Sequence, residues 1–126
     1  MKFEGNILKG MKNGKGKEYY DNGNLQYKGE YQNGIKNGEG KEYKYNGKLE
    51  FEGEYKFGKR WNGEGEENYY EDYNGFFYKH LFSGEYLDGQ RYNGEIRIYN
   101  EEHQLIHQLK ILNGTKIENN MNDQNQ

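Results

Sequence analysis

The sequence predicts an all-β protein: an elongated, single-layer, twisted antiparallel sheet of about eight to ten strands, made of tandem β-hairpin repeats. Two observations predict this fold. An aromatic position returns at intervals of about 24 residues along the 126-residue chain, and such a period is typical of repeat proteins. Around each of these positions apolar and charged residues alternate, which is typical of a half-buried strand.

The repeat unit is clearest in residues 27–40, which read YKGEYQNGIKNGEG. Its opening aromatic position is occupied, in chain order, by Phe3, Tyr27, Phe51, Phe82 and His107. Three series of glycines accompany it: Gly5, Gly29, Gly53 and Gly84; Gly10, Gly34, Gly58, Gly89 and Gly114; and Gly14, Gly38, Gly63 and Gly94. The repeat array is therefore expected to span residues 1–117, with units that start near residues 3, 27, 51, 82 and 107. The polar residues 118–126 are expected to form a disordered tail.

The composition indicates a folded chain with a core built from tyrosine. Only 31% of the residues are hydrophobic, but 17% are aromatic and the net charge is -3. The chain is therefore not of the strongly self-repelling kind that stays unfolded. Its 14 tyrosines can bury their ring faces while their hydroxyl groups stay hydrated. This property suits a single layer, which has no deep interior.

The first two hairpins are each expected to have a three-residue loop at one end. In the second hairpin, residues 45–47 form this loop, with its glycine in the left-handed region, and oppose Tyr43 to Leu49. This register gathers the aromatic residues on one face of the sheet. Residues 21–23 form the equivalent loop of the first hairpin. At the other end of the strands, residues 34–38 are expected to turn the chain back.

The last unit allows two readings. Residues 105–111 alternate in register with the earlier repeats, and Gly114 and Lys116 occupy their repeat positions. Alternatively, Asn100 caps a helix that ends at residues 113–114. The repeat register favours the strand.

The third hairpin is longer than the others, because each of its strands gains about three residues while Asn74 and Gly75 remain at its tip. Exposed aromatic clusters are typical of protein interfaces. The tip is therefore a candidate interface, made of Tyr69, Tyr70, Tyr73, Phe76, Phe77 and Tyr78. Alternatively, these rings fold back over the aromatic face of the sheet.

A series of cations follows the second glycine of each repeat. Its members are Lys12, Lys36, Arg60, Arg91 and Lys116. With two strands in each repeat, equivalent residues are spaced by about 10 Å, so these charges are expected to line one edge of the sheet. Such an edge is a candidate site for anionic lipid. Alternatively, each cation is a solvated turn residue paired with a glutamate.

The sequence carries no catalytic motif, cofactor motif or metal-binding motif. It has no cysteine, and the glycines lack the GxxxxGK[ST] pattern of a phosphate loop. His103 and His107 have the spacing of two metal ligands on a helix, but His107 lies at the aromatic repeat position, where a ring packs. The acidic balance opposes nucleic-acid binding. No signal peptide or membrane span is expected, so a cytoplasmic location is predicted.

The pattern of residues 27–40, aromatic-x-Gly-x-aromatic-x-x-Gly-x-x-x-Gly-x-Gly, resembles the MORN repeat. The resemblance extends over residues 3–116, although Tyr31, Tyr55 and Tyr86 stand where many units of that family have tryptophan. It implies a non-enzymatic repeat scaffold for protein–protein interaction or self-association. The alternatives that it leaves open are a phosphoinositide-binding module, peripheral at a membrane or cell cortex, and a regulatory segment of a larger enzyme or an antitoxin-like partner.

Overall fold

The computed structural model describes residues 2–118, and within them it contains ten β-strands and no helix. The all-β prediction is confirmed, and residues 105–112 form a strand and not a helix. Of the predicted tail, all but the first residue lies outside the described range. The strands are β1 (Lys2–Leu8), β2 (Met11–Tyr19), β3 (Leu25–Gln32), β4 (Ile35–Tyr43), β5 (Leu49–Lys56), β6 (Lys59–Tyr73), β7 (Phe76–Leu87), β8 (Gln90–Tyr99), β9 (Leu105–Leu112) and β10 (Thr115–Glu118).

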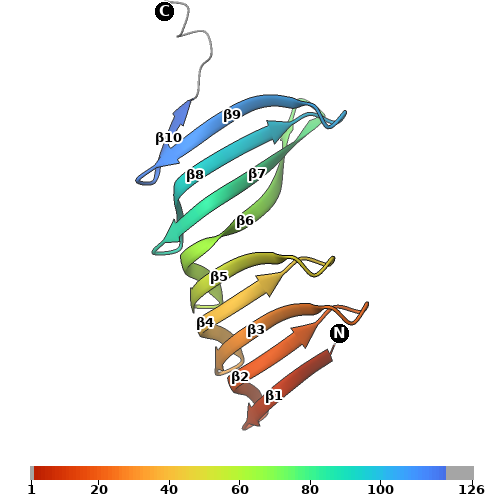
Figure 1. Cartoon of the computed structure of the whole chain (residues 1–126), viewed down its shortest axis with the longest axis vertical. Coiled ribbons are helices and arrows are strands. Elements are labelled where there is room, and N and C mark those ends of the chain that lie inside the picture. Colours follow the sequence, from red (N-terminus) through yellow and green to blue (C-terminus); the bar gives the residue numbers. More distant parts are fainter. Residues whose placement is uncertain (1, 119–126) are drawn as a thin grey trace, which may run out of the picture. The chain divides into compact units, whose positions relative to one another are not determined.

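The strands form a single open antiparallel sheet in which the spatial order equals the sequence order (Figure 1). The chain divides into two compact units. The first contains β1 to β5, the start of β6 and residues 86–89, and the second contains residues 66–85 and the chain from residue 90 onward. Among the described residues, no helix is long and apolar enough to cross a membrane.

The predicted three-residue loops are present. Tyr19 pairs with Leu25, and Tyr43 pairs with Leu49. In the first loop the Tyr20 amide donates a hydrogen bond of 2.8 Å to the Asn24 carbonyl. The glycines of the two loops have φ values of 90° and 93°, which only glycine adopts without strain.

The turns at the other end of the strands are tighter than expected. Each consists of two residues, such as Asn33 and Gly34, with φ values of 52° and 84°. Positive φ at both positions defines a type I′ turn, whose twist matches that of the strands. The next strand already begins at Ile35, and Gly38 lies within it at an irregularity of the pairing. The expected turn over residues 34–38 is therefore wrong in its width.

The core of the first unit is a single file of aromatic rings. Neighbouring rings meet edge to face, with centroid distances of 5.2–5.6 Å and interplanar angles of 77–90°. Such pairs add stability beyond the area they bury. Along the file the rings follow the order Phe3, Tyr31, Tyr27, Tyr55, Phe51 and Tyr86.

The glycines that accompany these rings lie in register on neighbouring strands. Gly16 pairs with Gly29, and Gly29 pairs with Gly40. A Cβ atom on Gly29 would collide with the Tyr27 hydroxyl oxygen and would lie 2.6 Å from the Glu39 carbonyl oxygen. The rings lie over the glycine backbone because no side chain occupies the space, as expected for glycine inside strands.

A β-bulge follows each three-residue loop. Glu50 is the unpaired residue of β5, because Tyr43 pairs with Leu49 whereas Glu42 pairs with Phe51. Gln26 is its equivalent in β3. The bulge ends the period-two alternation, so Leu49 is 50% exposed and does not join Phe51 in the core. The aromatic residues therefore share one face of the sheet, as expected, only in the part of each strand that follows the bulge.

Candidate functional site

The aromatic face of the first unit carries cations inserted between its rings. The Lys36 Nζ atom lies 4.5 Å from the ring centroid of Tyr27 and 5.7 Å from that of Tyr55. The Arg60 guanidinium carbon lies 4.8 Å from the ring of Phe51 and 5.4 Å from that of Tyr86. These distances are those of cation–π contacts, which strengthen as the cation loses water.

Carboxylates complete this arrangement, because the register that follows the bulge places them on the aromatic face. Glu42 is directly opposite both Tyr27 and Phe51. It accepts hydrogen bonds from Arg60 Nε and Nη2, both at 3.1 Å, and from the Tyr55 hydroxyl at 2.5 Å. Such a two-point contact between guanidinium and carboxylate is both strong and geometrically specific.

The first repeat uses a lysine in the same place. The Glu18 carboxylate accepts from Lys12 Nζ at 2.7 Å and from the Tyr31 hydroxyl at 2.6 Å. Burial raises the pKa of Tyr31 above its usual value, and the charge of Glu18 raises it further. The tyrosine is therefore held as a neutral donor.

The pKa values of these carboxylates lie below their usual range. Burial of Glu42 raises its pKa, but the hydrogen bonds from Arg60 and Tyr55 lower it more. The same balance, with Lys12 and Tyr31 as donors, lowers the pKa of Glu18. A carboxylate whose pKa is lowered by folding stabilises the folded state above its unfolded pKa, and this contribution is lost as the pH falls.

We therefore expect the free energy of unfolding to decrease as the pH falls below about 4.5, the ordinary pKa of glutamate. Urea unfolding at pH 7 and at pH 3.5 measures this change. The Glu42→Gln variant should show a smaller decrease than the wild type, because it cannot take up the proton. An equal decrease in both proteins would contradict a depressed pKa at Glu42.

Most members of the cation series lie over aromatic rings and beside carboxylates. Lys12, Lys36 and Arg60 lie over rings of the aromatic face. In the second unit, Arg91 lies 4.4 Å from the ring centroid of Tyr69 and 2.7 Å from a carboxylate oxygen of Glu67. Only Lys116 of the series is exposed. Contacts to rings and carboxylates favour the paired, structural reading of these residues over an anionic-lipid edge.

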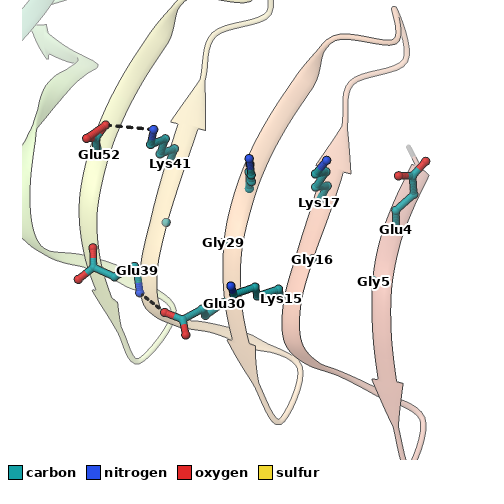
Figure 2. Close-up of a pocket in the computed structure, with 12 residues that line it drawn as sticks. Glu4, Gly5, Lys15, Gly16, Lys17, Gly29, Glu30, Glu39, Lys41 and Glu52 are labelled. Carbon is teal, nitrogen blue, oxygen red and sulfur yellow. Dashed lines mark hydrogen bonds and ion pairs between the residues drawn. The ribbon is translucent and has the colours of Figure 1, made fainter.

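The opposite face of the first unit carries a shallow groove of about 750 Å³ (Figure 2). Glycine backbone forms its floor. On one side, Figure 2 shows Glu4, Lys17, Lys41 and Glu52 along one line, and the strand pairing places Lys28 between the two lysines. On the other side are Lys15, Glu30 and Glu39.

This groove is not among the sites predicted from the sequence, although the sequence contains a signal for it. Residues 15–17 and 28–30 alternate glycine with charged residues. In a strand, neighbours of a glycine point to the face opposite its missing side chain. Two consecutive strands with this alternation therefore predict a glycine floor between two charged rows.

The long third hairpin is present in the second unit. The strand β6 has 15 residues and β7 has 12, whereas β4 has 9 and β5 has 8. Asn74 and Gly75 form its turn, with φ values of 55° and 87°. Four of the six candidate interface residues are more than half exposed: Tyr70 (67%), Tyr73 (56%), Phe76 (60%) and Phe77 (55%).

The other two candidates, Tyr69 and Tyr78, are half-buried. Tyr69 stacks on His80 with a centroid distance of 4.7 Å and an interplanar angle of 20°. The Arg91 guanidinium also lies over the Tyr69 ring. His80 is buried, and its burial lowers its pKa. The rings at the base of the hairpin are thus packed within the second unit, whereas the rings at its tip are exposed.

A cleft of about 330 Å³ adjoins the tip. Phe76, Phe77 and Tyr78 form one wall, and residues 100–102 form the other. The Phe77 amide donates a hydrogen bond of 3.1 Å to the Glu101 carboxylate, and the Gly75 amide donates one of 2.9 Å to Asp72. The tip backbone is therefore held in place by two side-chain carboxylates.

Fold and surfaces together define a tandem β-hairpin repeat protein. The family model of the MORN repeat matches residues 3–25 and 27–48 as two tandem units. Residues 3–48 therefore contain two MORN repeats, and the resemblance is confirmed for this part of the chain. This repeat is a non-catalytic module of protein and membrane interaction. A comparison with curated proteins finds no match.

Proposed function

We propose that the chain is a non-enzymatic scaffold that binds a protein partner, or a second copy of itself, through the tip of the third hairpin. The observation that supports this proposal is the group of four exposed rings, Tyr70, Tyr73, Phe76 and Phe77, on a fixed backbone. Aromatic residues dominate the energetics of protein interfaces, especially where a pocket adjoins them. Preorganisation lowers the entropy that binding costs.

The position of these rings outside the core makes a direct test feasible. The triple variant Tyr70→Ser, Phe76→Ser and Phe77→Ser removes aromatic surface that is already exposed to water. Its melting temperature should therefore remain close to that of the wild type. The matched control removes equally exposed apolar residues elsewhere, by Leu8→Ser and Leu49→Ser.

Two measurements are needed, one for binding to a second copy of the chain and one for binding to a different protein. Sedimentation velocity over a range of concentrations measures self-association, and quantitative affinity capture from the native cell measures other partners. We expect at least a tenfold loss of one of these in the tip variant, because each lost ring contributes on the order of 1–3 kcal/mol. The control should bind as the wild type does. A tip variant that associates at full strength would exclude the tip as the interface.

Deletion of the hairpin extension is a poor test by comparison. Removing residues 68–70 and 78–80 would restore the regular hairpin length. The structure shows that this deletion removes the stacked pair Tyr69 and His80, of which His80 is buried. Loss of the fold would then be confused with loss of binding.

A further inference from the structure

We propose that the groove on the charged face of the first unit binds an extended peptide segment of a partner protein in which acidic residues alternate with basic residues. The residues that line this groove are different from those of the hairpin tip. Its volume of about 750 Å³ lies within the range of ligand sites in proteins, about 300–1,000 Å³. The floor is made of glycines, so the backbone of a ligand can approach the backbone of the sheet closely.

The first argument is a row of like charges. Lys17 is directly opposite Lys28, and Lys28 is directly opposite Lys41. Like charges in this position on neighbouring strands destabilise a sheet. Lys41 has a partner, Glu52, at 3.5 Å. Within residues 2–118, neither Lys17 nor Lys28 forms an ion pair, because Glu4, which is directly opposite Lys17, pairs with Lys2. An anionic ligand would therefore supply a partner at the centre of the row.

The second argument is the opposite rim, which identifies the class of ligand. Glu30 and Glu39 are on that rim, and the Glu30 carboxylate is fixed by a hydrogen bond of 2.7 Å from the Glu39 amide (Figure 2). These carboxylates repel a ligand that is anionic on every side, such as a nucleic acid or a lipid headgroup layer. An extended peptide has two different sides, because successive side chains point in opposite directions.

The third argument is spacing. Neighbouring strands lie about 4.8 Å apart, so the three lysines extend over about 10 Å. Alternate residues of an extended peptide lie about 6.6 Å apart on the same side. Two acidic residues separated by one residue therefore fit between the three lysines. The residues between and beyond them face Glu30 and Glu39, where basic side chains would be favoured.

The probe is a fluorescein-labelled peptide in which glutamate alternates with lysine four times. A second peptide of the same composition, with its four glutamates before its four lysines, controls for net charge. We expect the fluorescence anisotropy of the alternating peptide to increase as wild-type protein is added at low salt. The affinity should be lower at high salt. The block peptide should bind at least tenfold more weakly.

The critical variant is Lys17→Gln, Lys28→Gln and Lys41→Gln. It should lower the affinity for the alternating peptide at least tenfold, while its melting temperature should not fall, because like-charge repulsion is removed. The matched control, Lys9→Gln, Lys48→Gln and Lys59→Gln, loses the same charge at exposed positions outside the groove. It should bind within about twofold of the wild type.

Three outcomes would overturn the proposal. They are the absence of peptide binding, an equal loss of affinity in both triple variants, and lysine-dependent binding of phosphatidylserine vesicles or of a single-stranded oligonucleotide in preference to the peptide. The tip variant of the proposed function should bind the peptide normally. Failure at the tip and failure at the groove are therefore distinguishable.

Discussion

Replacement of Arg60 by alanine is expected to lower the free energy of unfolding by about 3 kcal/mol. The side chains of Arg60 and Glu42 are only 15% and 23% exposed, so the substitution leaves a carboxylate largely removed from water without its cation. It also removes the guanidinium from between the rings of Phe51 and Tyr86. Urea unfolding followed by circular dichroism measures the change.

Two further variants separate these contributions. In the double variant Arg60→Ala, Glu42→Gln the orphaned charge is gone, so the loss of stability should be less than the sum of the single losses. The exposed pair of Lys41 and Glu52 is the control, and Lys41→Ala should cost no more than about 0.5 kcal/mol. If Arg60→Ala costs as little as Lys41→Ala, Arg60 behaves as a surface residue and our account of the aromatic face is wrong.

Substitution of Gly29 by alanine is expected to lower the free energy of unfolding by about 2–3 kcal/mol. The added Cβ atom would lie 2.6 Å from both the Glu39 carbonyl oxygen and the Gly40 Cα atom. These are backbone atoms of the neighbouring strand, so the strands must separate or the Tyr27 ring must leave its position. Thermal and urea unfolding report the loss.

The matched control for this prediction is Gly23→Ala. Nothing lies within 4 Å of the added atom at that loop position, but its φ is +90°, so only backbone strain of about 1–2 kcal/mol is expected. Adding Tyr27→Phe to Gly29→Ala removes the hydroxyl contact and should restore only part of the stability. If Gly29→Ala is less harmful than Gly23→Ala, the close packing of the glycine rows is refuted.

Much of the fold could be predicted from the sequence because the same pattern recurs in several repeats, so that one repeat tests the interpretation of another. The loop register that pairs Tyr43 with Leu49 followed from the face on which the aromatic residues must meet. The strand at residues 105–112 followed from the repeat register, although Asn100 offered a helix cap. In each case another repeat contains the same pattern, and this agreement favours one loop register, or a strand over a helix, where the local sequence allows both.

The candidate site was less predictable because it depends on bulges. A bulge adds one residue without a sequence signal of its own, and every later residue then changes face. Strict alternation places Glu50 on the charged face, whereas the structure places it 3.6 Å from Arg60. Glu42 is reassigned to the aromatic face in the same way. The pairing of these carboxylates with Arg60 could therefore not be read from spacing alone.

The hairpin order of the sheet also determines how such a chain can fold. Every strand from β2 to β9 pairs with the strand before it and the strand after it, across loops of a few residues. Closure of these short loops costs little entropy, so the relative contact order is low for an all-β protein and folding is expected to be fast for this class. During synthesis, each hairpin can therefore pack on the preceding one as soon as it leaves the ribosome, without waiting for the C-terminus.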